Sequence, residues 1–261
     1  MNEGYTRDNR YSQDITIPCY DTDASFRLKP ASFMDLAQEI AYRAATAMGF
    51  GYEALKENHA AWVLSRMCFK IHTPALWRDE TTLFTWHKGL SGPFFVRDFE
   101  LRRRDDTDFA DKSKVLVSCT TSWIGMNMDT RRVVMSDKLL DMVPGETSCP
   151  DDAIVENCGK VVMPKSHTPE LVATRVIQYS DVDINQHANN ARYIVWAMDC
   201  MDYDLVTSKA VKEVRINFNK EAKPGDTVEL YRSVTGTPEA PTWCVEGKVE
   251  GKSCFCAQFD F

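Results

Sequence analysis

The sequence predicts an α+β protein built from two tandem units, each with one long helix and an antiparallel β-sheet. Two stretches, one beginning at Pro30 and one at Asn189, carry apolar residues at the spacing of a buried helix face. Each stretch is followed by segments in which apolar and polar residues alternate, as they do in strands. A proline-containing polar segment separates the two halves, which indicates a linker.

The first unit is expected within residues 1–128. Its helix should begin at Pro30 and end at Gly49, because proline suits a first helical turn and glycine suits a helix end. The many alanines on its apolar stripe predict close packing against a sheet that wraps the helix. The stripe consists of Phe33, Met34, Ala37, Ile40, Ala41, Ala44, Ala45 and Met48. The strands are expected at 13–20, 61–72, 81–90, 94–104 and 114–126.

Residues 129–166 are predicted to be a linker that crosses the surface between the units. They include Pro144, Pro150 and Pro164, they show little alternation, and one short helical piece is expected at 136–143. The second unit follows at residues 167–261 and repeats the order of the first. Its helix is expected at 189–207, and its strands are expected at 171–179, 211–219, 227–234, 242–250 and 253–261.

The two units can be aligned with each other. Tyr20–Asp23 falls on Ser180–Asp183, and Phe33 then falls on Tyr193. The match is one of order and pattern more than of residue identity. It nevertheless indicates a tandem duplication.

The segment from Ser180 to Asn190 carries the strongest functional signal. Asp183, Asn185 and His187 stand at alternate positions, and an extended or tightly turned backbone would send all three to one side. The free N–H groups at the start of the following helix could polarise a carbonyl there. Asp and Asn also serve simply to start helices. The imidazole beside them favours a functional site.

The first unit lacks these polar residues. It has Ser25 and Arg27 at the positions of Asn185 and His187. A purely structural role in the fold would predict similar residues in both copies. The difference therefore predicts a single active site in the second unit, with the first unit left for binding.

Residues 181–194 resemble the signature of plant and bacterial acyl-acyl-carrier-protein (acyl-ACP) thioesterases. They read Asp-Val-Asp-Ile-Asn-Gln-His-Ala-Asn-Asn-Ala-Arg-Tyr-Ile. Trp62–Met67 adds a supporting likeness, and the resemblance extends from about Thr16 to Phe261. It implies a fold of two hotdog units in one chain, each a long helix wrapped by an antiparallel sheet.

The resemblance also implies a catalytic set, which is Asp183, Asn185, His187 and Glu221. The family's catalytic glutamate lies a few residues into a strand after the second helix, and Glu221 stands at that position. Plant members often have a cysteine directly after this glutamate, whereas Ala222 stands here. Attack by water, or by the carboxylate itself, is therefore expected. The resemblance implies no cofactor and no metal.

The expected reaction is hydrolysis of a fatty acyl thioester carried on ACP. Glu221 would be the general base or the nucleophile, and His187 would activate the water and protonate the leaving thiolate. Asn185 would position the water or the carbonyl, Asp183 would hold the loop in shape, and N–H groups of the second helix would stabilise the oxyanion. Two alternatives stay open: a hotdog acyl-CoA thioesterase or acyl dehydratase, and a non-catalytic acyl-binding module.

Composition narrows the function classes further. The net charge of −7 argues against a nucleic-acid partner. No run approaches the ~18 apolar residues of a membrane span, and Met1–Gln13 lacks the apolar core of a signal peptide, so a cytoplasmic protein is expected. The nine cysteines are scattered, as reduced thiols are, and Cys254 with Cys256 lacks the further ligands of a zinc site.

An acidic carrier protein as partner would need a local basic surface near the site. The candidate contributors are Arg102, Arg103, Arg104, Arg131, Arg132, Lys160 and Lys165. The acyl chain would need an apolar tunnel. The candidate wall is the helix face with Phe33, Met34, Ala37, Ile40 and Ala41. A homodimer is left open, because isolated hotdog units usually pair.

Overall fold

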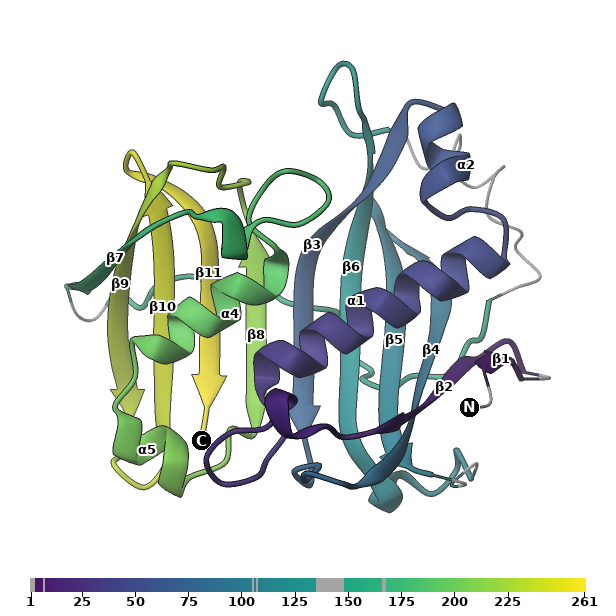
Figure 1. Cartoon of the computed structure of the whole chain (residues 1–261), viewed down its shortest axis with the longest axis horizontal. Coiled ribbons are helices and arrows are strands. Elements are labelled where there is room, and N and C mark those ends of the chain that lie inside the picture. The colour runs from purple at the N-terminus through teal and green to yellow at the C-terminus, as the bar shows by residue number, and fades with distance from the viewer. Residues whose placement is uncertain (1–2, 7, 105, 107, 135–147, 166–167) are drawn as a thin grey trace.

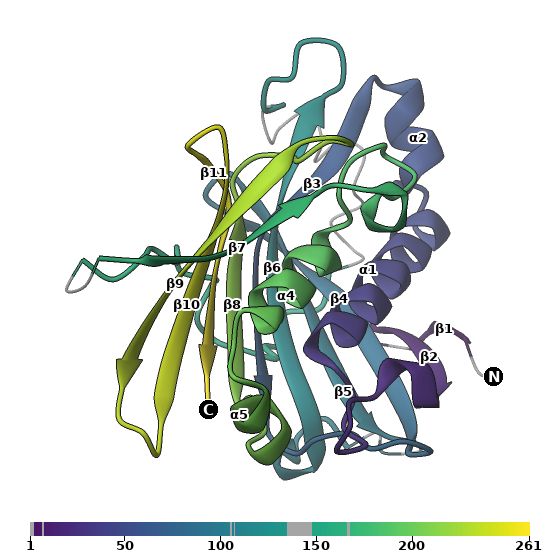
Figure 2. The same ribbon diagram turned by 60° about the vertical axis from the view of Figure 1, so that its left-hand side comes forward.

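The computed structural model describes all residues except 1–2, 7, 105, 107, 135–147 and 166–167, so the helix expected at 136–143 lies outside the described residues. Within the described part, the strands form one antiparallel eleven-stranded sheet in the order β1-β2-β4-β5-β6-β3-β8-β11-β10-β9-β7. The long helices α1 and α4 lie on the same face of this sheet (Figures 1 and 2). The fold is therefore α+β, with two helix-and-sheet units side by side.

The order of elements follows the predicted duplication. The first unit consists of β1 (Glu3–Tyr5), β2 (Tyr11–Thr16), α1 (Pro30–Ala47), α2 (Tyr52–Glu57), β3 (Ala60–Ile71), β4 (Glu80–Ser91), β5 (Phe94–Arg103) and β6 (Val115–Asn127). The second consists of β7 (Glu170–Val176), α4 (Asn190–Asp199), α5 (Tyr203–Ser208), β8 (Glu213–Phe218), β9 (Thr227–Gly236), β10 (Pro241–Val249) and β11 (Lys252–Asp260). Among the described residues, no helix is long and apolar enough to cross a membrane.

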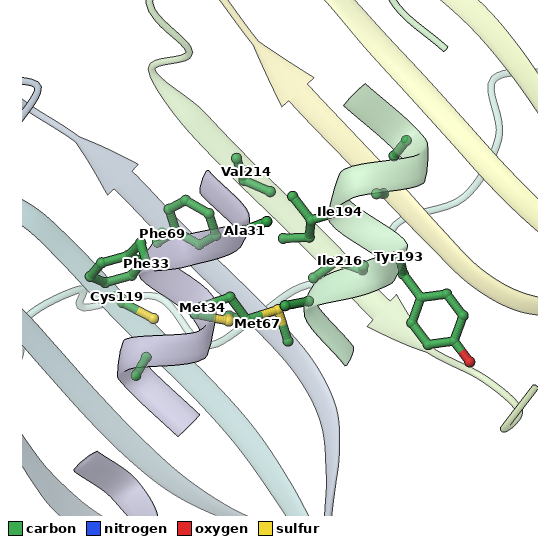
Figure 3. Packing of buried hydrophobic residues seen from close by; sticks show 14 of the residues in the cluster. Ala31, Phe33, Met34, Met67, Phe69, Cys119, Tyr193, Ile194, Val214 and Ile216 are labelled. Carbon is green, nitrogen blue, oxygen red and sulfur yellow. The ribbon is translucent and has the colours of Figure 1, made fainter. Parts of the chain in front are cut away.

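Strand β3 joins the two units into one sheet. It pairs with β6 on one side and with β8 on the other, and Met67 on β3 stands opposite Ile216 on β8. Met34 on α1 and Ile194 on α4 pack over these residues in the main core (Figure 3). All of the predicted α1 stripe except Met48 is buried, as its close approach to the sheet requires.

Two predicted elements end earlier than their patterns suggested. The strand expected at 13–20 stops at Thr16, because Pro18 has no N–H to donate to the ladder, and a short 3₁₀ helix follows at Cys19–Asp21. The helix expected at 189–207 ends at Asp199 and restarts as α5. Arg232 donates to the carbonyl of Cys200 at this break, with Nη1 and O 2.9 Å apart.

Part of the predicted linker covers the face of the sheet opposite α1 and α4. Met67 and its alternate neighbour Phe69 face the main core, whereas Cys68 between them packs against Ile154 and Cys158. Strand side chains hold the linker backbone in place: Trp86 Nε1 donates to the carbonyl of Asp151 at 2.7 Å. The linker therefore contributes to the core as well as connecting the units.

One residue of the predicted basic surface is not at the surface. Arg102 is fully buried on β5, where its Nε lies 2.8 Å from Glu100 Oε2 and its Nη1 lies 3.0 Å from Asp106 Oδ2. Its guanidinium also stacks on the ring of Phe109. A charge this deep needs paired partners, so Arg102 stabilises the first unit and cannot contact a carrier protein.

Replacing Asn217 should destabilise the whole fold. Its buried side-chain amide accepts from Val161 N–H at 2.8 Å and donates to Val161 O at 2.7 Å. We expect Asn217→Ala to cost about 2–4 kcal/mol in urea unfolding, because two buried backbone groups lose their partners. Asn219→Ala removes an exposed bond to Ser253 and should change stability by less than about 0.5 kcal/mol. Equal effects of the two changes would contradict this account.

Candidate active site

The segment before α4 forms a tight turn held by Asp183. The carboxylate oxygen Oδ1 of Asp183 accepts from Asn185 N–H at 2.8 Å, and its carbonyl accepts from Gln186 N–H at 3.0 Å. Asp183 N–H in turn donates to the carbonyl of His187 at 3.1 Å. Gln186 adopts a left-handed φ of 65° to close the turn. The backbone is therefore turned and not extended between Asp183 and His187.

The first unit repeats the main hydrogen bonds of this turn. Asp23 N–H donates to the carbonyl of Arg27 at 2.8 Å, and Phe26 takes the left-handed place of Gln186 with a φ of 63°. The Asp23 carboxylate accepts from the N–H groups of Ser25 and Arg27 at 2.8 and 2.9 Å. An aspartate at the head of the turn thus serves its shape in both copies. Asn185 and His187 are the residues that distinguish the second copy.

In the first copy, Arg27 closes the place that His187 occupies in the second. Its Nη2 donates to the carbonyl of Val206 at 2.6 Å, and its Nε bonds the Asp23 carboxylate at 2.9 Å. Ser25 Oγ donates to the carbonyl of Thr207 at 2.8 Å. These contacts tie the first turn to α5 and leave no free acid–base group there.

Glu221 and His187 come together from separate elements. Glu221 follows β8, beyond the end of the strand at Phe218, so it lies in a connecting segment where the resemblance implied a strand. Its Oε1 lies 3.5 Å from Nε2 of His187, and both side chains are 26% exposed. A carboxylate and an imidazole at this distance, open to solvent, can share the proton of a bound water.

The backbone beside Glu221 is fixed by two residues of the second unit. Ala222 N–H donates to the hydroxyl of Tyr193 at 3.1 Å, and the Ala222 carbonyl accepts from Ala188 N–H at 2.8 Å. Burial raises the pKa of Tyr193 above its usual range, so its hydroxyl stays neutral. In the sequence, Tyr193 stands out only as the position on which Phe33 falls when the two units are aligned. The Ala222 bond was not visible in the sequence, because it depends on how α4 packs against the end of β8.

The second carboxylate oxygen of Glu221 forms an ion pair with Arg131 Nη2. Arg131 follows β6, in the segment predicted as the linker. Sequence reasoning had placed it only among the basic surface residues. The contact joins residues far apart in the chain, so no local pattern could have revealed it.

The start of α4 is less open than expected. Asn189 caps the helix, and its side-chain oxygen accepts from Ala191 N–H at 2.8 Å. Asn189 N–H donates to Asp181 O, and Ala188 N–H donates to Ala222 O, both at 2.8 Å. The N–H group of Ala191 in the first turn of α4, and those of Ala188 and Asn189 before it, are therefore engaged within the chain. The exposed amide of Asn185 keeps only a long contact, 3.4 Å, to Asp183 Oδ2.

Similarity to known proteins agrees with this architecture of a duplicated hotdog unit with one polar turn. The acyl-ACP thioesterase N-terminal domain matches residues 8–142, and the acyl-ACP thioesterase C-terminal domain matches residues 166–253. The chain therefore belongs to the acyl-ACP thioesterase family.

Relatives and solved structures are distant but extensive matches. An oleoyl-acyl carrier protein thioesterase of Coriandrum sativum is 24% identical over 85% of this chain, and a palmitoyl-acyl carrier protein thioesterase of Gossypium hirsutum is 26% identical over 86%. Both are named chloroplastic, and the chain spans 62% and 55% of their lengths.

Two solved structures share the fold. They are an acyl-ACP thioesterase from Bacteroides thetaiotaomicron, with a TM-score of 0.82 and 22% identity, and the 12:0-ACP thioesterase from Umbellularia californica, with a TM-score of 0.83 and 19% identity. The first match covers 96% of this chain and 97% of the other, and the second covers 96% of each.

The cysteines should be unreactive in the folded protein, with one exception. Eight are buried and only Cys19 is exposed. Burial raises the pKa of Cys158 and Cys256 to about 12 and that of Cys200 and Cys244 to about 11, which removes the reactive thiolate. We expect iodoacetamide at pH 8 to label about one thiol per native chain rapidly, and none in Cys19→Ser. Rapid native labelling of several thiols, read by intact mass, would count against this burial.

Proposed function

We propose that this chain hydrolyses the thioester of a fatty acyl group carried on ACP, releasing a free fatty acid and the carrier thiol. The meeting of Glu221 and His187 at 3.5 Å carries this proposal. Family membership supports it, and so does the absence of an equivalent pair in the first copy of the turn, where Arg27 is bound to α5. Both groups are accessible enough to meet a substrate carbonyl.

Glu221 acts as the general base in this proposal. Both of its carboxylate oxygens already face partners, Arg131 and His187, and attack on a carbonyl would require it to leave them. Glu221 instead removes one proton from a water as the water oxygen bonds to the carbonyl carbon. The carbon–sulfur bond then breaks, and the proton passes from Glu221 through His187 to the departing sulfur.

Asn185 and Asp183 have supporting roles. The Asn185 amide has one long contact, so its N–H groups remain able to bind the carbonyl oxygen as negative charge develops. Asp183 holds the turn that carries Asn185 and His187, as its counterpart Asp23 does in the first copy. The four residues therefore divide into a base with a proton relay, a carbonyl donor and a scaffold.

The acyl chain is proposed to lie against α1. We therefore divide the chain into an acyl-binding unit at residues 1–128, a linker at 129–166 and a catalytic unit at 167–261. The buried α1 face is continuous with the core between the units. Ala37 and Ala41 stand on this face, where a larger side chain would intrude on the proposed path of the acyl chain.

Glu221→Gln and His187→Ala should each reduce turnover of acyl-ACP by about 10²–10⁴-fold, because each removes a proton-transfer group from the reaction. Release of the carrier thiol, measured with a chromogenic thiol reagent, follows the rate, and thermal melting confirms folding. Glu53→Gln, an exposed change on α2, is the matched control. Full activity in a folded Glu221→Gln variant would falsify the role of base.

The same assay separates the alternative functions. Turnover of acyl-ACP without thiol release would indicate a dehydratase, and thiol release from acyl-CoA alone would change the assigned carrier.

Ala37→Leu should shift the product profile toward shorter fatty acids. Ala37 is 2% exposed on the proposed wall, and the larger side chain would shorten the space beside it. The stability cost should stay within about 1–3 kcal/mol, as is usual for overpacking. Chromatography of fatty acids released from carriers of mixed chain length measures the profile. An equal loss for every chain length, with a lower melting temperature, would show that Ala37 serves only packing.

A further inference from the structure

We propose that Arg131 is a positioning residue for Glu221, so that the turn after β6, at the start of the linker, completes the active site of the second unit. This inference rests on the proposed function. Arg131 Nη2 pairs with Oε2 of Glu221, while Oε1 of the same carboxylate faces His187 Nε2 at 3.5 Å. A carboxylate with a partner on each oxygen cannot rotate freely. Arg131 therefore keeps Oε1 directed toward the imidazole and toward any water between them.

The sheet brings Arg131 and Glu221 to the same end of its strands. Strands β6 and β8 both pair antiparallel with β3, one on each side of it. They therefore run in the same direction, and their C-terminal ends point to the same end of the sheet. Arg66 on β3 stands opposite both Ser122 on β6 and Asn217 on β8. Arg131 and Glu221 both lie beyond the ends of these strands, after Asn127 of β6 and Phe218 of β8. Figure 1 shows the turn after β6 at the same end of the sheet as the loop that leads into α4.

The turn after β6 is built to hold Arg131 in place. The side-chain oxygen of Asn127 accepts from Thr130 N–H at 2.8 Å and from Thr130 Oγ1 at 2.9 Å. Arg131 N–H donates to Asn127 O at 2.9 Å, and Asn127 N–H donates to Arg132 O at 2.8 Å. Arg131 itself adopts a φ of 56°, a left-handed conformation that an arginine takes only where its surroundings impose it.

A second set of contacts ties this turn to the beginning of β3. Met128 N–H donates to the carbonyl of His59 at 2.8 Å, and His59 Nδ1 lies 3.0 Å from Asp129 Oδ2. Val134 N–H returns to the carbonyl of Gly125 at 2.8 Å, which closes the far side of the turn. The position of Arg131 is therefore set by the first unit and does not depend on Glu221 alone.

Arg131 could otherwise be one of the cations that dock an acidic carrier protein. The two roles differ in what they change. A docking residue affects how tightly the carrier binds, whereas a positioning residue affects the rate of the bound complex. The Arg131 side chain is 52% exposed, but its guanidinium is already paired with a carboxylate of the same chain, which favours the second role.

The test compares Arg131→Ala, Arg131→Lys and Arg175→Ala in the full chain, with acyl-ACP as substrate and thiol release as readout. Arg175 forms an exposed pair with Asp199 at 2.9 Å, so its removal is the matched control. We expect Arg131→Ala to lower kcat by about ten-fold or more with KM within about two-fold of wild type. Arg131→Lys should recover part of kcat, because the charge remains and the forked geometry is lost. Arg175→Ala should match wild type.

Two further variants separate positioning from folding. Asn127→Ala removes the side-chain acceptor of the turn, so it should lower kcat less than Arg131→Ala and add nothing to it in the double variant. Arg131→Ala should also have no further effect in the Glu221→Gln background, since its partner is already altered. Thermal melting of each variant shows whether it is folded. If Arg131→Ala does not fold, the kcat of Arg131→Lys is used for the test instead.

An unchanged kcat in Arg131→Ala, with or without a higher KM, would overturn the inference, and a higher KM alone would identify a docking cation. An equal loss of kcat in the wild-type and Glu221→Gln backgrounds would also overturn it. These results leave the proposed function intact, because wild type and Arg175→Ala still release thiol. If wild type releases no thiol from acyl-ACP, the proposed function fails, and the inference that rests on it fails as well.

Discussion

The pairing of β3 with β8 is the interaction on which the rest of the structure depends. It turns two helix-and-sheet units into one sheet and sets Met67 against Ile216 in a core that α1 and α4 share. It also makes β6 and β8 run in the same direction, so that the segments that follow these two strands lie at the same end of the sheet. The contact between Glu221 and Arg131 follows from this arrangement, because neither residue reaches the other without that register. A shift of one residue would send the core side chains to the opposite face.

The duplicated turn shows that its shape and its chemistry are separable. Asp23 and Asp183 each accept from the N–H group two residues later, and Phe26 and Gln186 adopt the same left-handed conformation, so the two copies share the shape of the turn. One copy uses that shape to direct a guanidinium onto the carbonyl groups of α5, which joins the units. The other uses it to bring an imidazole to a carboxylate. The first copy thus gains a structural contact where the second has reactive groups.

Local patterns predicted the elements well, and tertiary contacts explain what they missed. The α1 helix from Pro30 and the strands of both meanders follow from periodicity, which the chain carries in itself. The prediction that His187 and Glu221 belong to one site came only from the resemblance to the family, because no rule of residue spacing links the two. The break after Asp199 depends on Arg232 from a distant strand, and the pairing of Arg131 depends on sheet register. Such features belong to the assembled fold and leave no signal in the neighbouring sequence.

The residues predicted to form a basic surface differ in their partners. Arg102 is buried against Glu100, and Arg131 is bound to Glu221. Arg103 and Arg104 face Asp79 and Glu80 at 3.6 and 3.1 Å, which offsets much of their charge. The other members of the predicted basic surface, Arg132, Lys160 and Lys165, are exposed. The Arg131 side chain is itself 52% exposed, and what distinguishes its pair with Glu221 is that the hydrogen bonds of the turn after β6 fix the backbone of Arg131. In the proposed function, a carrier that binds through these three residues would leave the pair of Arg131 with Glu221 in place.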